Sequence, residues 1–366
     1  MIIGIPKEIK LEERRVSLTP DGVKIFVKQG HRVIVEHKAG VGCGIPDRAF
    51  REAGGIIIHS HAAVWEKADM IMKVKEPLES EFPLMRANQI VFTFLHLAAN
   101  RPLSVSLIKK KSIGIAYETV QLNNGILPIL RPMSEIAGRL SVQLGARGLE
   151  AKSGGRGILI GGVEGFSPAR VTILGGGSAG FRAAEVASGM GGLVTVLEIN
   201  RRRVDKLKDF FGNRVMVKRS TPRSLEHELV KADLVISAVL NPGAKAPKLI
   251  TRNLVKKMKP GAVIVDIAVD QGGCCETIRP TTHAQPFYSR YGVVHCGITN
   301  LPSTVPLSST QALTQASLPY ALEIANKGYS SAAQDNPAIR KGINVVNGKL
   351  TNQAVADALG LACHNI

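Results

Sequence analysis

The sequence predicts an α/β protein with two doubly wound domains, each built on a mainly parallel sheet, and a cleft between them. Three observations support this prediction. Short runs of apolar, mostly β-branched residues alternate with helical runs along the chain. A glycine-rich loop connects one of these runs to a helix. The chain of 366 residues also exceeds the length at which a single hydrophobic core usually keeps growing, so two domains are expected.

The first third of the chain predicts five strands with helices between them. Thr19 is a suitable N-cap, and Pro20 a suitable first residue, for a predicted helix at Asp21–Gln29. Gly30 ends this helix. Strands that alternate with helices in this way form a parallel sheet covered on both faces. The apolar runs that predict the strands are Ile2–Ile5, Arg32–Glu36, Asp69–Val74, Ile90–Leu95 and Ser112–Tyr117.

Polar residues follow three of these predicted strands, at the end of a parallel sheet where ligands bind. Arg15, next to Arg14, lies in the loop after the first strand. Lys75 follows the third strand and His96 follows the fourth. Taken singly, Lys75 beside Glu76 is more typical of a surface lysine, and His96 fits a hydrogen-bonded core histidine equally well. Their joint placement favours a site for a small carboxylate, which Arg binds bidentately and Lys binds as a point charge.

The glycine loop has the spacing Gly175-x-Gly177-x-x-Gly180 and follows a predicted strand at Arg170–Leu174. In a dinucleotide-binding turn the first glycine allows the tight turn, the second lets a pyrophosphate approach, and the third lets helix and strand pack closely. The N-terminus of the following helix, Phe181–Met190, offers N–H groups to phosphates. A second apolar run ends in Glu198, where a carboxylate can bind ribose hydroxyls. This order favours a Rossmann-like nucleotide site over a plain strand–helix turn.

The remainder of the chain predicts three more strands and a helical tail. Asp270 follows the second of these strands, where it can act on a reacting amine or water, or close the loop. The tail has too few strands to form a domain alone, so we expect it to pack against the first domain. The predicted domains are 1–129 plus 307–366 for the substrate and 130–306 for NAD. The strands are Leu234–Ala238, Ala262–Ala268 and Gly292–Ile298, and the tail helices are Thr310–Asn326 and Gln353–Leu359.

The formal net charge of +18 raises the question of a nucleic-acid partner. Only 4% of the residues are aromatic, and none of them is interleaved with the basic clusters, which gives little support to base stacking. The charge is more typical of a solvated surface that attracts anions. The five cysteines lack metal-type spacing, and no segment resembles a signal peptide or a membrane span. We therefore expect reduced thiols, no metal and a cytoplasmic location.

Several sequence blocks occur in a fixed order along the chain: Gly4-Ile-Pro-Lys-Glu-Ile9, Arg15-Val-Ser-Leu-Thr-Pro20, Lys73-Val-Lys-Glu-Pro77, Leu95-His-Leu-Ala98, Gly154-Gly-Arg-Gly157, Asp266-Ile-Ala-Val-Asp-Gln-Gly-Gly273 and Arg279-Pro-Thr-Thr-His283. Through these blocks the chain resembles the alanine dehydrogenase and transhydrogenase nucleotide-subunit family over nearly its whole length. The segment Leu130-Arg-Pro-Met-Ser134, interpreted as a loop, resembles the dehydrogenase branch, and no segment resembles the membrane part of a transhydrogenase.

The resemblance implies NAD-dependent oxidative deamination of L-alanine to pyruvate and ammonia, and the reverse reductive amination. It implies that Arg15 and Lys75 bind the substrate and that His96 and Asp270 form the acid–base pair. It also implies a homo-oligomer, usually a hexamer, without a membrane or a specific nucleic acid as partner. Contacts to NAD are implied for Ser134, Gly175, Gly177, Ser178, Ala179, Gly180, Glu198, Arg203, Ser220, Val239, Leu240, Ile267, Asp270, Arg279, Ile298, Asn300 and Leu301.

The chain departs from the family pattern at several positions. Phe94 stands where relatives more often have Tyr, which removes a hydroxyl beside His96. Glu198 replaces the more usual Asp and keeps its charge. Lys327 stands where some members place a metal-binding His, so a metal site with Glu323 is not expected. Three other functions stay open: an NAD enzyme for another small L-amino acid, a non-catalytic NAD-binding protein, and a nucleic-acid-binding protein.

Overall fold

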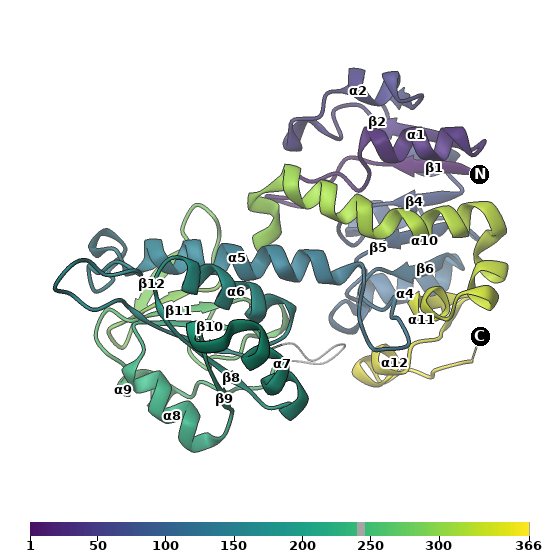
Figure 1. Ribbon diagram of the computed structural model, residues 1–366. Coiled ribbons are helices and arrows are strands. Elements are labelled where there is room, and N and C mark those ends of the chain that lie inside the picture. The colour runs from purple at the N-terminus through teal and green to yellow at the C-terminus, as the bar shows by residue number, and fades with distance from the viewer. Residues whose placement is uncertain (240–245, 366) are drawn as a thin grey trace. The chain divides into compact units, whose positions relative to one another are not determined.

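The computed structural model describes residues 1–239 and 246–365 (Figure 1). The chain divides into two compact units, each an α/β fold with a mainly parallel sheet, which confirms the predicted fold class. Unit 1 contains Met1–Met133 and Ser303–Ile366, and unit 2 contains Ser134–Pro302. The unit boundaries therefore lie a few residues from the predicted domain boundaries at 129/130 and 306/307.

Unit 1 contains an eight-stranded sheet with the order β15-β14-β6-β5-β4-β1-β2-β3. Six strands are parallel, and the chain builds the sheet outward from β1 in one direction and then from β4 in the other, as doubly wound folds do. The strands are β1 Ile2–Ile5, β2 Arg32–Glu36, β3 Ile56–Ile58, β4 Met70–Met72, β5 Ile90–Thr93, β6 Ile113–Ala116, β14 Ile343–Val346 and β15 Lys349–Leu350. The helices are α1 Pro20–Lys28, α2 Asp47–Glu52, α3 His61–Lys67, α4 Arg101–Lys110, α10 Pro306–Asp335, α11 Pro337–Gly342 and α12 Gln353–Leu359.

The tail of the chain is an integral part of unit 1, as predicted. Strand β14 pairs antiparallel with β6, with Ile343 opposite Ile115. Helix α10 lies beside α1 (Figure 1). Val355 and Ala356 of α12 belong to the same hydrophobic core as Leu107 of α4. The first sheet is therefore completed by residues from both ends of the chain.

Unit 2 contains a seven-stranded sheet with the order β12-β13-β11-β10-β7-β8-β9, in which all strands except β12 are parallel. The chain moves outward from β7 through β8 to β9, and then from β10 through β11 to β13, so the strand order reverses between β7 and β10. The strands are β7 Arg170–Leu174, β8 Leu193–Glu198, β9 Met216–Arg219, β10 Leu234–Ser237, β11 Val263–Asp266, β12 Phe287–Arg290 and β13 Val293–Cys296. The helices are α5 Leu130–Leu149, which begins in unit 1, α6 Ser178–Gly189, α7 Arg201–Phe211, α8 Pro222–Lys231 and α9 Arg252–Lys257.

Several predicted strands are shorter than expected, and in three of them a carboxylate binds the backbone where the strand was predicted to continue. Strand β4 ends at Met72, and the N–H of Val74 donates to Glu8 at 2.6 Å. Strand β5 ends at Thr93, and the N–H of Leu95 donates to Glu118 at 3.2 Å. Strand β11 ends at Asp266, whose own carboxylate accepts the N–H of Ala268 at 3.1 Å. Each of these three carboxylates is part of the site described below.

The interpretation of Leu130-Arg-Pro-Met-Ser134 as a loop is wrong, because helix α5 already begins at Leu130. Pro132 is the third residue of the helix, and the first turn has no intrahelical acceptor for its N–H groups, so a proline costs no hydrogen bond there. The helix predicted at Asp21–Gln29 is confirmed as α1. Thr19 is its N-cap, as predicted, and the hydroxyl of Thr19 accepts the N–H of Gly22 at 3.4 Å.

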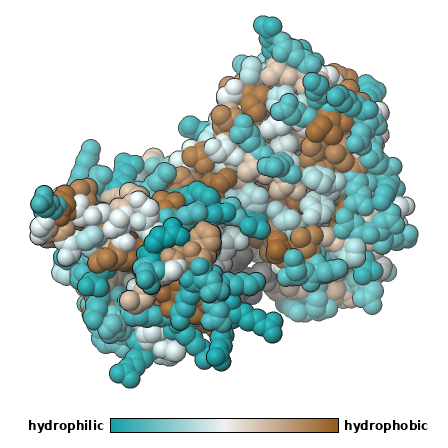
Figure 2. All heavy atoms as spheres, in the orientation of Figure 1, coloured by the Kyte–Doolittle hydropathy of each residue, from teal (hydrophilic) through white to brown (hydrophobic). Residues whose placement is uncertain are grey.

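The surface is rich in hydrophilic residues, with smaller apolar patches between them, on the face drawn in Figure 2. The basic cluster Arg201, Arg202 and Arg203 is exposed at the start of α7. Within the ranges that the structure describes, no helix combines the length and apolar character needed to cross a membrane.

Candidate active site

The carboxyl ends of β1, β4 and β5 are adjacent at the point where the strand order of unit 1 reverses. The loops that follow these three strands carry Arg15, Lys75 and His96. Ligands of doubly wound sheets bind at such reversal points, because the loops on either side diverge there. The structure therefore brings the three predicted unit 1 residues to neighbouring strand ends.

Arg15 is buried, and Glu13 binds one side of its guanidinium. Nε donates to Oε1 of Glu13 at 2.7 Å, and Nη2 donates to Oε2 at 2.5 Å. Nη1 donates to Sδ of Met133 at 3.2 Å. Because the guanidinium is planar, these contacts fix the direction of all its N–H groups, and Glu13 compensates the buried charge. Arg15 is thus a pre-oriented donor group.

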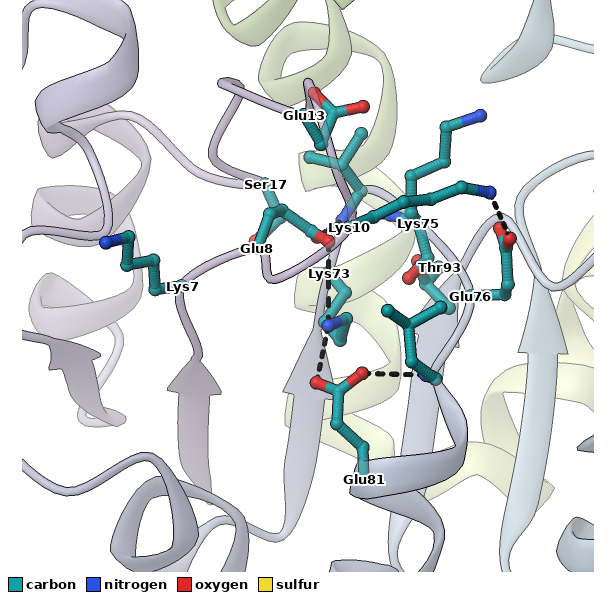
Figure 3. A network of polar contacts seen from close by, with 12 residues as sticks. Lys7, Glu8, Lys10, Glu13, Ser17, Lys73, Lys75, Glu76, Glu81 and Thr93 are labelled. Atoms are coloured by element: carbon teal, nitrogen blue, oxygen red, sulfur yellow. Dashed lines mark hydrogen bonds and ion pairs between the residues drawn. The ribbon is translucent and has the colours of Figure 1, made fainter. Parts of the chain in front are cut away.

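Two lysines after β4 have different surroundings. Lys73 is 1% exposed and pairs with Glu81 at 2.6 Å and with Glu8 at 3.5 Å. Burial disfavours its charge, but the two carboxylates outweigh this and raise the pKa of Lys73. Lys75 is also buried, which excludes the alternative of a solvent-exposed surface lysine. Figure 3 shows its side chain directed away from Lys73, toward the side where Lys10 lies.

Glu8 connects the loops that follow β1 and β4. Its Oε1 accepts the N–H groups of Val74 at 2.6 Å and of Lys75 at 3.2 Å. Burial raises the pKa of Glu8, whereas His61 and Lys73 lower the pKa of Glu81 against the effect of burial. The closer partner of Lys73 is therefore the more firmly ionised one. This buried network holds the backbone of Lys75 in place (Figure 3).

His96 has an unusual backbone that is held by a carboxylate. Its φ is 49° and its ψ is 37°, which lie in the left-handed region that residues other than glycine rarely adopt. Glu118, after β6, accepts the N–H of His96 at 2.6 Å and that of Leu95 at 3.2 Å. The ring of Phe94 lies nearly parallel to the imidazole, with centroids 5.9 Å apart. The imidazole itself is half-exposed.

Glu76 binds the imidazole of His96 from the neighbouring loop after β4. Its Oε2 lies 3.2 Å from Nδ1 of His96, and its Oε1 pairs with Lys10. Burial opposes the charge of Glu76, but His96 and Lys10 together hold its pKa well below the usual range. The loops after β1, β4 and β5 are thereby connected through one carboxylate.

In unit 2, backbone conformation and close packing within the chain require a glycine at two of the three positions of the glycine loop. Gly175 has φ +88° and lies against the backbone of Ala238 at the end of β10. A Cβ at Gly180 would lie 1.8 Å from the carbonyl oxygen of Gly175. A Cβ at Gly177 would meet no atom within 4 Å, so packing within the chain does not require a glycine at this position.

Glu198, at the end of β8, is bound to the glycine loop. One carboxylate oxygen accepts the N–H of Gly176 and the other that of Asn200, both at 2.8 Å. Nη1 of Arg203 lies 3.4 Å from the first oxygen. The backbone carbonyl of Glu198 accepts the N–H of Ser220 at 2.9 Å. The predicted ribose-binding acid is therefore held beside the predicted pyrophosphate loop.

The other predicted cofactor residues are distributed around the same sheet. Ser178 and Ala179 begin α6, and a Cβ at Gly138 of α5 would lie 2.1 Å from the carbonyl oxygen of Ala179, so α5 packs directly on this turn. Ser134 lies in α5. The segments after β10, β11 and β13 contain Val239, Ile267, Arg279, Ile298, Asn300 and Leu301. Leu240 lies outside the described residues.

Asp270 is exposed in the short helix Val269–Gln271 of unit 2. The base of its loop is fixed by Asp266, whose Oδ2 accepts the N–H groups of Cys274 at 2.7 Å and Cys275 at 3.0 Å. Burial raises the pKa of Asp266. The predicted acid–base pair thus comes from two units, with His96 in unit 1 and Asp270 in unit 2.

Lys327, at the position of a metal-binding His in some relatives, forms ion pairs with Glu323 at 3.1 Å and Asp335 at 2.8 Å. Its ammonium therefore lies between two carboxylates. Over residues 1–239 and 246–365, the structure contains no group of three or more His, Cys, Asp and Glu side chains with the geometry of a metal site.

The sequence prediction missed the carboxylates that position the predicted groups. They are Glu8, Glu13, Glu76, Glu118 and Asp266. A signal was available for three of them, since Glu13 lies two residues before Arg15, Glu76 directly follows Lys75, and Glu118 lies beyond a predicted strand end. The partners of Glu8, Glu76 and Glu118 lie on other loops that strand pairing brings together, which the spacing of residues does not show.

Two models of one protein family together match nearly the whole chain. Residues 4–137 match the family model "Alanine dehydrogenase/PNT, N-terminal domain", and residues 141–353 match "Alanine dehydrogenase/PNT, C-terminal domain". An alanine dehydrogenase of Methanococcus maripaludis is 53% identical over 98% of this chain and 96% of its own length. One of Staphylococcus saprophyticus is 53% identical over 100% of this chain and 99% of its own. A solved L-alanine dehydrogenase superposes with a TM-score of 0.94 at 48% identity, covering 98% of this chain and 99% of that chain. The chain belongs to the alanine dehydrogenase/PNT family.

Proposed function

We propose that the protein catalyses the NAD-dependent oxidative deamination of L-alanine to pyruvate and ammonia, and the reverse reductive amination. The observation that carries this proposal is the set of Arg15, Lys75 and His96 on three adjacent strand ends. Two buried cations beside an imidazole suit a small carboxylate that must exchange protons. The full-length likeness to relatives named alanine dehydrogenase supports the same reaction.

The nucleotide turn of unit 2 fits NAD. The proposal explains why position 177 is a glycine, because the open space there lets a pyrophosphate approach the N-terminus of the twelve-residue helix α6. Glu198 would bind the ribose hydroxyls through acceptor positions that Gly176 and Asn200 leave unused. When bound, NAD supplies the acceptor for the hydride, and the protein supplies orientation and charge.

The side chains of unit 1 have distinct proposed tasks. The pre-oriented guanidinium of Arg15 and the ammonium of Lys75 hold the carboxylate and carbonyl region of the amino acid. His96 and Asp270 take up and return protons as water adds to the substrate carbon and ammonia leaves. From the family resemblance we also propose a cytoplasmic homohexamer, which sedimentation analysis of the purified protein would test.

The first prediction is that the protein reduces NAD when supplied with L-alanine. NADH formation, followed by absorbance across a panel of small L-amino acids, is expected to be fastest with L-alanine. A higher kcat/KM for another amino acid would assign the enzyme to that substrate. Cofactor binding without NADH formation from any amino acid would favour a non-catalytic NAD-binding protein.

The second prediction concerns the choice of cofactor. We expect kcat/KM to be higher with NAD than with NADP, because the carboxyl group of Glu198 at the end of β8 leaves no favourable place for a 2′-phosphate. The exposed Arg201 and Arg202 would attract that phosphate, so the two effects oppose each other. Paired rate measurements at one ionic strength decide between them, and a preference for NADP would contradict the role given to Glu198.

A further inference from the structure

We propose that Glu76 is a positioning residue that fixes the ring of His96, so that Nε2 is the nitrogen that exchanges protons with the substrate. This inference rests on the proposed function, because it assigns a task to one atom of the proposed acid–base group. Neither the family assignment nor the fold identifies which ring nitrogen reacts. The inference follows from the contacts of three loops, after β1, β4 and β5.

The imidazole of His96 is held at one edge. Its Nδ1 lies 3.2 Å from Oε2 of Glu76, whose side chain is 11% exposed, whereas the side chain of His96 is 43% exposed. The other oxygen of Glu76 pairs with Lys10, from the loop after β1 (Figure 3). The ring is therefore anchored on its Nδ1 edge to a mostly buried carboxylate that also pairs with a partly exposed lysine.

The protonation of Glu76 decides the tautomer of His96. A carboxylate is an acceptor only, and the two cationic partners hold the pKa of Glu76 well below its usual range, so it stays ionised. Nδ1 must then carry the hydrogen of this contact. In the neutral imidazole the lone pair is consequently on Nε2, and in the imidazolium the transferable proton is there.

The backbone of His96 is fixed independently of its ring. Glu118 binds the N–H groups of Leu95 and His96, which stabilises the left-handed backbone at φ 49°. The charged groups in contact with His96 are therefore Glu76 at the ring and Glu118 at the backbone, with Lys10 behind Glu76. Because Glu118 remains in any variant of Glu76, a change at position 76 alters the ring without removing the hydrogen bonds that hold the turn.

The test is the variant Glu76→Gln in the full-length protein. Its amide can donate to Nδ1 and so favour the wrong tautomer. We expect kcat for L-alanine oxidation to fall roughly 10–100-fold, the usual effect of losing such a partner, with KM nearly unchanged. The acid limb of the pH–rate profile is expected to move to lower pH, because removal of the anion destabilises the imidazolium. Glu76→Asp, which keeps the carboxylate, is expected to restore the position of that limb.

Glu79→Gln is the matched control, because it removes the charge of an exposed glutamate three positions along the same segment. It is expected to keep wild-type kcat and pH profile. Wild-type kcat and pH profile in Glu76→Gln would overturn the inference and leave the proposed function intact. An inactive wild-type protein would instead contradict the proposed function. If Glu76→Gln does not fold, Glu76→Ala takes its place: a loss of about tenfold or more in kcat at nearly unchanged KM supports the inference, and full turnover overturns it.

Discussion

Replacement of His96 by Ala is expected to lower kcat for L-alanine oxidation by roughly 10²–10⁴-fold, the usual contribution of a positioned acid–base group. Asp270→Asn is expected to lower kcat for the same reason. The predicted contacts to NAD lie in unit 2, whereas His96 lies in unit 1. Binding of NADH to His96→Ala, measured by fluorescence titration, should therefore stay close to that of the wild type.

A surface histidine provides the control for this experiment. The side chain of His227 in α8 is 52% exposed, compared with 43% for His96, and it also contacts a glutamate, at 3.1 Å from Glu228. His227→Ala is expected to leave kcat unchanged. If His96→Ala and Asp270→Asn both retain wild-type turnover, the assignment of the acid–base pair is wrong.

Lys73→Met is expected to lower the free energy of unfolding by about 3–5 kcal/mol, because it leaves the buried carboxylate of Glu8 without its cation and leaves Glu81 with His61 alone. Lys73 is 1% exposed, and its partners Glu8 and Glu81 have side chains that are 3% and 1% exposed. Methionine fills a similar volume, so loss of the charge is the main change. Urea unfolding followed by circular dichroism gives the difference directly.

A pair with the same geometry and different burial is the control. Nζ of Lys257 lies 2.6 Å from Glu226, as Nζ of Lys73 does from Glu81, but the side chains of that pair are 57% and 50% exposed. Lys257→Met should cost only about 0–1 kcal/mol, because water already screens the pair. Equal losses in the two variants would show that burial does not set the strength of the Lys73 network.

The central strands of both sheets could be predicted because they are apolar on both faces. Strand β7 has the predicted bounds Arg170–Leu174, and β10 and β13 lie within predicted runs. The strands that were not predicted lie at or near sheet edges. Strand β3 has three residues, and β9 includes Lys218 and Arg219, since an edge strand is less enclosed and tolerates charge. Strand β3, Ile56–Ile58, is apolar but too short, and β9 is too charged, to show the longer apolar run that indicates a buried strand.

The candidate site was predictable to the extent that its residues follow strands along the chain. Arg15, Lys75 and His96 were found in this way, because each lies beyond an apolar run. The contacts between loops were not predictable. Whether Glu76 faces His96, or Glu13 faces Arg15, depends on loop conformations such as the left-handed backbone of His96, for which its neighbours in the sequence give no signal.

The antiparallel strand β14 has a consequence for biosynthesis. Unit 2 is one continuous segment, and all of it leaves the ribosome before Ile343 of β14, the strand that pairs with β6. Translation proceeds from the N-terminus, so the edge of β6 stays unpaired until β14 has been synthesised. Until then it presents unpaired N–H and C=O groups to other nascent chains. Ribosome stalling after unit 2 should accordingly yield a folded nucleotide unit attached to an aggregation-prone first sheet.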